Sequence, residues 1–536
     1  GKIALKDIEY NSLSLSYTLP VSKFDFLAGK FLAAFITGIF VFAFGVLGIL
    51  TGTVMPYLDP VQFGPATVNN YLFPFVTMIV PNILFLSALF YMLGSVFRNY
   101  FVNWLAIILL YGLYYGCNQL SNQPDYSYLA GIIDPFGINA INNSEVGLSS
   151  EQLNSNVFDP NHVIMFNRFF WIFIGVVCFL ITYLKFSFQY SIKKQKRTKG
   201  NEAEVQNNKV GMQHLLLKPV STVFSAFTNF KQFLFLVKYE WQLLFKNFYF
   251  KSILFIGFIL LIISSLAIGK MYDTNTYPVA YNVSEVFLGA MKLFLFVVIT
   301  IFSGEMIWRE RSLNTHFVGD ALPVTTTVKY FSKIGALTLF VFVAHLFIII
   351  IGLLVQYFKG YTNYEISVYK QLVIGIGFTS TLFTIGLAFI VQAMVSNRFV
   401  GYFIMLAYYC FKSFLASSVL EDNTFNFNSA PFIEYSDMNE FGYNVPVFVF
   451  YKFYWLLFVA LLLVIANKFY PTGIDIGFKT RLQQFKKQFH VGSYKYGVIL
   501  LSLLFLLCAS FMYYNIHIKN NYVSSYESEQ QMVSYE

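Results

Sequence analysis

Residues 332–356 read SKIGALTLFVFVAHLFIIIIGLLVQ, and stretches of this kind decide the fold class. After Lys333 the stretch holds no charged side chain, and as a helix it is long enough to cross the roughly 30 Å hydrocarbon core of a bilayer. Ten further apolar blocks of similar length occur in the 536 residues. The sequence therefore predicts an all-α polytopic membrane protein with eleven spans. The predicted spans cover residues 31–55, 71–97, 99–117, 168–187, 250–268, 284–303, 332–356, 371–395, 399–418, 447–467 and 495–514.

Charged residues make up 12% of the chain and hydrophobic residues 57%, whereas soluble proteins average about 25% charged residues. This composition excludes a soluble enzyme, a disordered chain and a nucleic-acid binder. The net charge of +9 fits a membrane protein, because such proteins gather Lys and Arg in their cytoplasmic loops. The four cysteines, Cys117, Cys178, Cys410 and Cys508, form no CxxC pair, and no HExxH sequence occurs. We therefore expect no disulfide framework, no metal site and no nucleic-acid partner.

The loops between the predicted spans differ sharply in charge. Loops 118–166 and 419–446 contain no Lys or Arg and five acidic residues each, whereas segment 188–251 contains eleven basic residues. Alternating the eleven spans places all the basic segments on one side of the membrane and both acidic loops on the other. Because cytoplasmic loops carry the positive charge, the N-terminal end is predicted to be cytoplasmic and the C-terminal end periplasmic. The other basic segments are residues 1–30, 304–333 and 468–495.

The chain also contains an internal repeat. Residues 1–21, GKIALKDIEYNSLSLSYTLPV, align without a gap with residues 304–324, GEMIWRERSLNTHFVGDALPV. The two copies lie 303 residues apart, and each leads into a predicted span. Both halves also place their long acidic loop before their last span. We interpret the chain as two repeated halves. The second has six spans and the first shows only its last four, so two N-terminal spans are expected to be absent.

Segment 304–323 is a candidate site of mechanical coupling. It mixes charged and apolar side chains and ends at Pro323, which predicts a short amphipathic helix along the membrane surface. A cytoplasmic partner that pushes on such a helix moves the attached spans as rigid bodies; the alternative is an ordinary solvated helix start. A second interfacial helix is predicted at residues 237–247. The candidate coupling residues of both copies are Lys6, Asp7, Glu9, Glu305, Trp308, Arg309, Glu310 and Arg311.

Four further patterns point to a known family. They are Gly304-Glu305 with Trp308-Arg309-Glu310-Arg311, Asp320-Ala321-Leu322-Pro323, Asp134-Pro135-Phe136-Gly137, and Asn167-Arg168 with Trp171. With these patterns the chain resembles the ABC-2 class of ABC-transporter permeases, and within it the bacterial permeases that are fused to a periplasmic M1-type aminopeptidase-like domain. The peptidase part has no counterpart in these residues.

The resemblance implies two six-span permease halves with a coupling helix between spans two and three, followed by one C-terminal span. It also implies a cytoplasmic ATP-binding-cassette subunit as the partner that hydrolyses ATP. The expected location is the bacterial inner membrane, in contact with membrane lipid, and other envelope proteins are further expected partners.

The predicted organisation follows from the spans and the repeat. It comprises a first permease half at 1–190, a cytoplasmic linker with the interfacial helix at 191–248, a second half at 249–468, a basic linker at 469–494, a final span at 495–514 and a periplasmic tail at 515–536.

The chain contains no G-x-x-x-x-G-K-[ST] phosphate loop. We therefore expect it to bind no cofactor itself and not to be an enzyme, and no catalytic residue is predicted. The predicted function is the membrane-spanning permease subunit of an ABC-2 type, ATP-driven exporter. One alternative is a non-transporting anchor or scaffold for a periplasmic peptidase-like domain or an envelope complex. Another is an ATP-independent channel or secondary transporter.

A few charged residues and prolines lie in the predicted spans. Lys292 lies within a span, and charges inside spans are candidates for function. Lys412 and Lys452 lie near outer ends, where their side chains are expected to reach toward the surface. Pro74 and Pro81 share one span and predict a kink there, because each lacks a backbone N–H.

Overall fold

The structure, a computed structural model, describes residues 2–9, 12, 18, 20–53, 68–98, 100–121, 123–149, 152, 162–187, 225–271, 274–414, 421–433, 435–436, 438–473, 477–489 and 494–535. The chain forms two compact units, which we describe separately. Unit 1 comprises Gly1–Val220 and Ile262–Thr276, and unit 2 comprises Ser221–Leu261 and Tyr277–Glu536.

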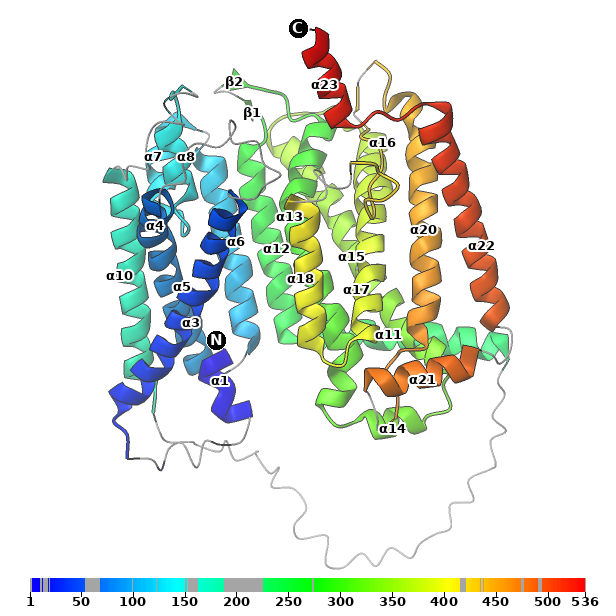
Figure 1. Cartoon of the computed structure of the whole chain (residues 1–536), viewed down its shortest axis with the longest axis horizontal. Helices are drawn as coiled ribbons and strands as arrows, with labels where there is room; N and C mark the ends of the chain where they lie inside the picture. The colour runs from blue at the N-terminus through cyan, green and yellow to red at the C-terminus, as the bar shows by residue number, and fades with distance from the viewer. Residues whose placement is uncertain are drawn as a thin grey trace, which may run out of the picture. The chain divides into compact units, whose positions relative to one another are not determined.

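Unit 1 is built from helices and one short hairpin (Figure 1). Helices α5 and α10 pack along one another, and the rings of Phe85 and Trp171 lie 4.5 Å apart between them. The elements are α1 (Lys2–Glu9), α3 (Lys23–Gly52), α4 (Val68–Pro74), the π-helix η1 (Phe75–Ile79), α5 (Val80–Phe97), α6 (Tyr100–Ser121), α7 (Pro124–Ile133), α8 (Ile138–Glu145), α10 (His162–Lys185) and the antiparallel strands β1 (Lys270–Met271) and β2 (Thr274–Asn275).

Unit 2 is a larger helical bundle, with the buried side of α13 packed against α15, α17 and α18. Helix α12 begins here and ends in unit 1. The elements are α11 (Ala226–Lys246), α12 (Phe248–Ala267), α13 (Ala280–Ser312), α14 (His316–Ala321), α15 (Thr326–Phe358), α16 (Ile366–Tyr369), the π-helix η2 (Lys370–Phe378), α17 (Thr379–Met394), α18 (Arg398–Phe414), η3 (Gly442–Asn444), α20 (Val445–Asn467), α21 (Phe478–Phe489), α22 (Tyr494–Tyr513), the π-helix η4 (Tyr514–Lys519) and α23 (Ser525–Tyr535).

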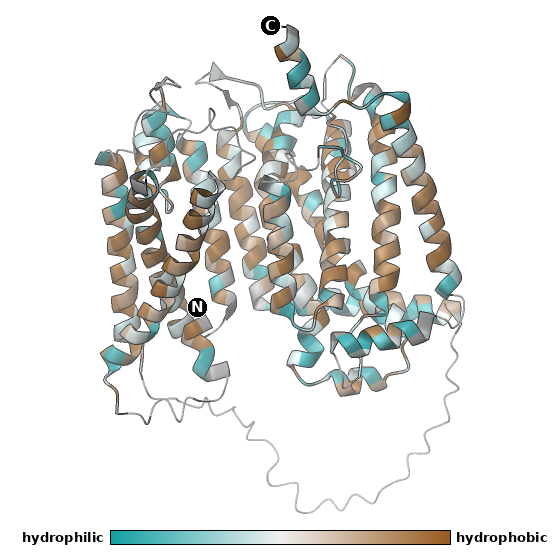
Figure 2. Ribbon diagram, in the orientation of Figure 1, coloured by the Kyte–Doolittle hydropathy of each residue, from teal (hydrophilic) through white to brown (hydrophobic). Residues whose placement is uncertain are grey.

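In the described residues, eight helical stretches are long and apolar enough to cross a membrane, and the bent pair α11 and α12 would add a ninth. Hydrophobic residues run along these stretches in both units (Figure 2). The chain is therefore a multi-pass, all-α membrane protein. Eight of the predicted spans coincide with these stretches. The predicted spans 99–117, 250–268 and 399–418 overlap α6, α12 and α18, which are not among the eight stretches, so the count of eleven stays a prediction.

Helices α3 and α15 begin in the same way. The hydroxyls of Ser22 and Thr325 each cap their helix by accepting a hydrogen bond from the backbone N–H three residues later, at 3.1 Å and 3.4 Å. Such hydroxyls satisfy one of the N–H groups that a helix start leaves unpaired. The two caps lie 303 residues apart, which is the spacing of the sequence repeat.

Both units also contain a π-helix within a predicted span. The five-residue η1 lies directly between Pro74 and Pro81, whose missing N–H groups disturb the regular hydrogen-bond pattern. The irregularity that these prolines predict thus takes the form of a π-helix. The nine-residue η2 in unit 2 has no proline but contains Gly375 and Gly377.

Segment 304–323 differs from the predicted single short helix. Residues 304–312 are instead the last turns of the 33-residue α13, and the six-residue α14 follows after a turn. Met306, Ile307 and Trp308 are buried inside unit 2, and this packing lets α13 continue. The chain turns at Asn314, whose φ of 55° suits asparagine better than most residues.

Candidate functional site

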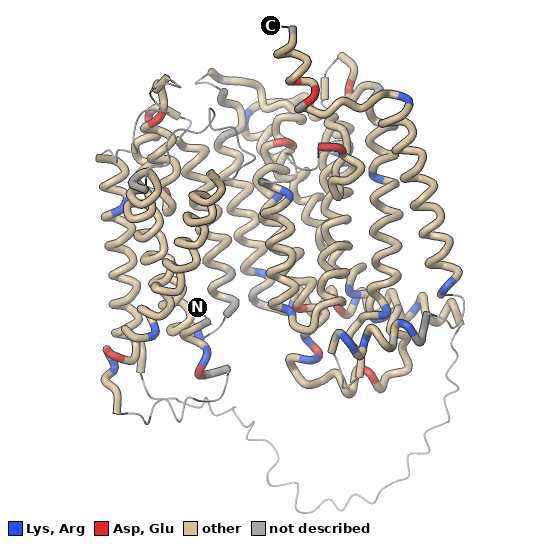
Figure 3. Tube along the Cα trace, in the orientation of Figure 1, with Lys and Arg blue, Asp and Glu red and all other residues tan. Residues whose placement is uncertain are grey.

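Lys and Arg residues gather at one end of unit 2, where α11, α14 and α21 lie (Figures 1 and 3). We call this end the basic end. Its cations that make the contacts described below are Arg309, Arg311, Lys329, Lys333, Arg398 and Arg481.

A buried ion-pair network lies at the centre of the basic end. The ammonium group of Lys333 on α15 lies 2.8 Å from Glu240 on α11 and 3.0 Å from Glu310 on α13. The other carboxylate oxygen of Glu240 accepts a hydrogen bond from Arg309 at 2.8 Å. The side chains of Lys333 and Glu240 are only 2% and 5% exposed. The network therefore joins three helices at one point, and each charge depends on the others, because an unpaired buried charge is very costly.

A second set of contacts holds α14 beside this network. Lys329 on α15 lies 3.6 Å from Asp320 and also donates to the backbone carbonyl of Gly319. Asp320 accepts a hydrogen bond from the backbone N–H of Gly473 at 3.0 Å, and Arg311 donates to the carbonyl of Gly473 at 2.8 Å. Helix α14 is thus tied to α15 and to the segment after α20.

The end of α13 also contacts α17 and α18. The indole N–H of Trp308 donates to the side-chain oxygen of Gln392 at 3.1 Å, and both side chains are buried. Glu305 lies 2.9 Å from Arg398 at the start of α18. These contacts fix the last turns of α13 against the turn between α17 and α18.

Arg481 connects α21 to the same turn. Its side chain is buried, and its guanidinium donates to the carbonyls of Ala393, Met394 and Val395 at 2.6, 3.2 and 2.7 Å, and to Phe469 at 2.8 Å. Carbonyls at a helix C-terminus lack helical partners and carry partial negative charge. Arg481 therefore caps α17 from a different helix.

Unit 1 contains a counterpart of the Lys333–Glu310 pair. Asp7 on α1 and Lys30 on α3 form an ion pair whose side chains are 17% and 22% exposed. Asp7 and Lys30 each lie 303 residues before Glu310 and Lys333. Leu5, which the repeat aligns with Trp308, is likewise buried. In both copies of the repeat, an ion pair thus connects the segment that is predicted to be cytoplasmic with the helix that follows it.

Most of the predicted coupling residues contact other residues of their own unit. Four of the five in the second copy pair with side chains of other elements, and Arg311 binds the carbonyl of Gly473. In the first copy, Lys6 is exposed and Asp7 is paired, whereas the side chain of Glu9 lies outside the described residues. Segment 304–323 also exposes four large apolar side chains. They are Leu313, Phe317, Val318 and Leu322, which are 65%, 59%, 71% and 55% exposed.

Three buried charged residues of this site were not among the coupling residues predicted from the sequence. Glu240, Lys333 and Arg481 are buried charges that meet partners far away in the chain. A signal existed for Lys333, which continues the gapless repeat at the position of Lys30. The available signal for Glu240 was its position as a lone acid on the apolar side of an amphipathic helix.

A buried polar cluster lies in unit 1 and explains the Asp134-Pro135-Phe136-Gly137 pattern. The carboxylate of Asp134 accepts from the backbone N–H groups of Phe136 and Asn139 at 2.9 and 2.8 Å. Gly137 has a φ of 75°, and a Cβ there would lie 2.2 Å from the guanidinium of Arg168. Glycine is therefore required both by its backbone conformation and by the packing.

The sequence Arg168-Phe169-Phe170-Trp171, at the start of predicted span 168–187, resembles Lys452-Phe453-Tyr454-Trp455, near the start of predicted span 447–467. The matched cations Arg168 and Lys452 make similar contacts. Arg168 on α10 donates to Asn82 on α5 at 2.7 Å. Lys452 on α20 lies 3.4 Å from Ser380 on α17 and donates to the side-chain oxygen of Asn428 at 2.9 Å. Both thus connect their helix to the span that contains the π-helix.

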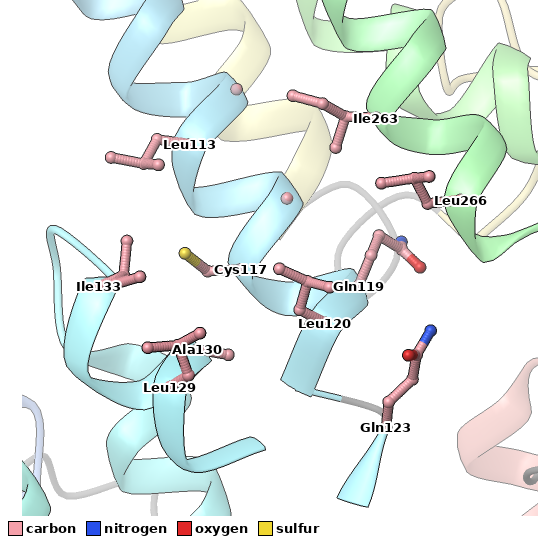
Figure 4. Close-up of a pocket in the computed structure, with 12 residues that line it drawn as sticks. Leu113, Cys117, Gln119, Leu120, Gln123, Leu129, Ala130, Ile133, Ile263 and Leu266 are labelled. Atoms are coloured by element: carbon pink, nitrogen blue, oxygen red, sulfur yellow. The ribbon is translucent and has the colours of Figure 1, made fainter. Parts of the chain in front are cut away.

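Figure 4 shows a largely apolar cavity of about 280 Å³ in unit 1, between α6, α7 and the last turns of α12. Cys117 lies on its wall beside Leu113 and Leu120. The cavity offers no cluster of acidic or basic groups for chemistry. In the part of the chain that the structure describes, no group of three or more His, Cys, Asp or Glu side chains is placed to hold a metal ion.

Comparison of the chain with protein-family models, with curated proteins and with solved structures gives no significant match. The function is therefore argued from the residues and contacts above.

Proposed function

We propose that the chain is the membrane-spanning permease subunit of an ABC-2 type exporter in the bacterial inner membrane. In this proposal the eleven predicted spans form two repeated halves and one final span. The basic end faces the cytoplasm, where a separate ATP-binding-cassette subunit docks and supplies ATP hydrolysis. This orientation accords with the gathering of Lys and Arg at that end (Figure 3).

The observation that carries the proposal is the matched pair of connections Asp7–Lys30 and Glu310–Lys333. Each connects the segment that precedes a capped helix to that helix, at the same spacing of 303 residues. A transporter that a symmetric pair of ATPase domains drives needs an equivalent point of force transfer in each half. A membrane anchor has no such need.

Helix α14 is the proposed contact with the ATPase subunit. Its exposed Phe317 and Val318 offer an apolar surface at an end that is otherwise charged. The pairs Lys329–Asp320 and Lys333–Glu310 connect this surface to α15, and Glu240 extends the connection to α11. The predicted coupling residues Arg309 and Glu310 therefore transmit force rather than touch the partner.

The test is purification of the protein from its native membrane in mild detergent. We expect an ATP-binding-cassette subunit to co-purify with the wild type, and Phe317→Asp to lower its recovery and its associated ATPase activity at least tenfold. Phe432→Asp is the matched control, because Phe432 is also exposed, at 78%, but lies in the acidic loop. Absence of the ATPase subunit from the wild type, or its full recovery with Phe317→Asp, contradicts the proposal.

One observation favours the anchor alternative. The segment after α22 contacts the acidic loop 419–446. His517 lies 3.0 Å from Asp422, and the backbone N–H of Ser525 donates to Glu421 at 2.9 Å. Such an attachment holds whatever follows the final span at a fixed place. The co-purification experiment separates the two functions, because an anchor requires no ATPase subunit.

A further inference from the structure

Helices α13 and α18 pack against each other in antiparallel fashion in unit 2. At the basic end, Glu305 on α13 lies 2.9 Å from Arg398 on α18. Farther along, the rings of Phe296 and Tyr409 lie with their centroids 4.6 Å apart. Residue numbers fall along α13 as they rise along α18, so each contact is a rung between the two helices. At the basic end, an ion pair of opposite charges thus joins the two helices.

The next rung away from the basic end consists of two like charges. Lys292 lies four residues before Phe296, and Lys412 lies three residues after Tyr409. These are the spacings at which side chains share a helix face, and both steps lead away from the basic end. Lys292 and Lys412 therefore lie at the same level, and the charge of Lys292 acts on Lys412.

Neither lysine has an anionic partner within the part of unit 2 that the structure describes. The ion pairs found there involve other cations. Lys412 donates to the neutral backbone carbonyl of Phe427, and Lys452 binds the adjacent residue Asn428. Three ammonium groups are thus brought near one another, and none of them forms an ion pair within the described residues.

The space beside Lys292 is open. A Cβ placed on Gly289, one turn away on the same helix, would meet no atom within 4 Å, and the side chain of Lys292 is exposed. Lys292 lies twelve residues into α13, which corresponds to about 18 Å from the start of the helix. The ordinary fate of such a lysine is to extend toward the nearer surface. In that direction α13 carries Glu285, which is also exposed and lies two turns away from Lys292.

We propose that Lys292 and Lys412 form a binding site for the anionic headgroup, a phosphate or a carboxylate, of an amphiphilic molecule. Its apolar part lies along exposed apolar side chains of α18 such as Leu406 and Phe411, and its charge bridges the two ammonium groups. Charges within membrane spans commonly mark the path of a substrate. The site rests on the proposed transport function only in that the bound amphiphile is the transported substrate; the binding itself is independent of ATP.

The experiment measures binding of dodecyl phosphate to the purified protein in a neutral detergent. We expect dodecyl phosphate to bind at least tenfold more tightly than dodecyl phosphocholine and than inorganic phosphate. Lys412→Met and Lys292→Met each weaken binding of dodecyl phosphate at least tenfold, and Lys412→Arg keeps it within threefold. Lys359→Met is the matched control, since Lys359 is exposed just after the end of α15, and it leaves binding within twofold.

A charge reversal separates loss of the site from loss of the fold. Lys292→Glu supplies Lys412 with an internal carboxylate, so this variant should lose binding of dodecyl phosphate and yet melt at a higher temperature than the wild type. Equal binding of dodecyl phosphate and dodecyl phosphocholine overturns the site, and so does unchanged binding by Lys412→Met. Inorganic phosphate binding as tightly as dodecyl phosphate overturns its assignment to an amphiphile. If dodecyl phosphate binds as expected but no ATPase subunit co-purifies from the native membrane, only the proposed function is overturned.

Discussion

The ion pairs Asp7–Lys30 in unit 1 and Glu310–Lys333 in unit 2 have the same spacing and the same helix context, but their surroundings differ. Lys30 remains 22% exposed, whereas Lys333 is 2% exposed and has Glu240 as a further partner. A partly exposed pair is weakened by water and contributes little to stability. A buried network contributes mainly by making each member dependent on the rest. Similar sequences thus produce a replaceable contact in one unit and an irreplaceable junction in the other.

The largest effect is expected from Lys333→Met. Removal of the ammonium group leaves the carboxylates of Glu240 and Glu310 facing each other, and Glu240 stays buried. Loss of one member of a buried ion pair costs about 3–5 kcal/mol. We therefore expect Lys333→Met to be strongly destabilised in thermal unfolding of the detergent-solubilised protein.

A second variant distinguishes lost pairing from lost packing. In the double variant Lys333→Met with Glu240→Gln, a neutral amide replaces the carboxylate of Glu240, which is 5% exposed. A large part of the stability should therefore return. If the double variant melts no higher than Lys333→Met, the charge network does not account for the stability of this junction.

Much of the fold could be predicted from the sequence, because long apolar blocks and a gapless repeat depend only on neighbouring residues. Eight predicted spans are confirmed as helices of sufficient length and hydropathy. The extent of α13 was missed, since Met306 and Trp308 look like the apolar face of a surface helix until the partners that bury them are known. As predicted, Pro323 lies just after the end of a helix, which is α14. The chain already turns at Asn314, however, so segment 304–323 is not one helix.

The candidate site was harder to predict than the fold. The positions of Arg309 and Glu310 follow from the repeat, but their partners do not, since Glu240 lies 69 residues away from Arg309 in the chain. Arg481 binds carbonyls that belong to a helix end, and no sequence pattern marks a helix end as open to another helix. Contacts of this kind depend on how helices distant in sequence pack.

A much smaller effect is expected from Lys30→Met in unit 1. Its ion pair with Asp7 is partly exposed, so water can solvate Asp7 when the ammonium group is removed. Exposed pairs contribute about 0–1 kcal/mol. Thermal unfolding of Lys30→Met beside Lys333→Met measures the comparison directly. If Lys30→Met lowers the thermal stability as much as Lys333→Met does, the two ion pairs contribute equally to stability despite their different burial.

The smallest effect at neutral pH is expected from Tyr470→Phe, which also tests how dry the buried junction is. Continued without a gap, the match of Arg168 with Lys452 places Phe186 of unit 1 opposite Tyr470, so the variant gives unit 2 the residue of unit 1. Burial raises the pKa of Tyr470 to about 12, against the opposing charge of Lys333. Because the folded pKa lies above the unfolded value near 10, the hydroxyl's contribution is fully present below pH 10 and is lost as the pH rises toward 12.

The measurement is the difference in unfolding free energy between the wild type and Tyr470→Phe from pH 7 to pH 11. It should stay constant up to about pH 9 and then fall. The loss reaches about 1.4 kcal/mol by pH 11, since each pKa unit corresponds to about 1.4 kcal/mol, and it would be about 3 kcal/mol above pH 12. Tyr277→Phe is the control, because Tyr277 is 78% exposed. The absence of this decline would mean that water reaches the hydroxyl and that its folded pKa stays near 10. The junction around Lys333 would then resemble the partly exposed pair of unit 1.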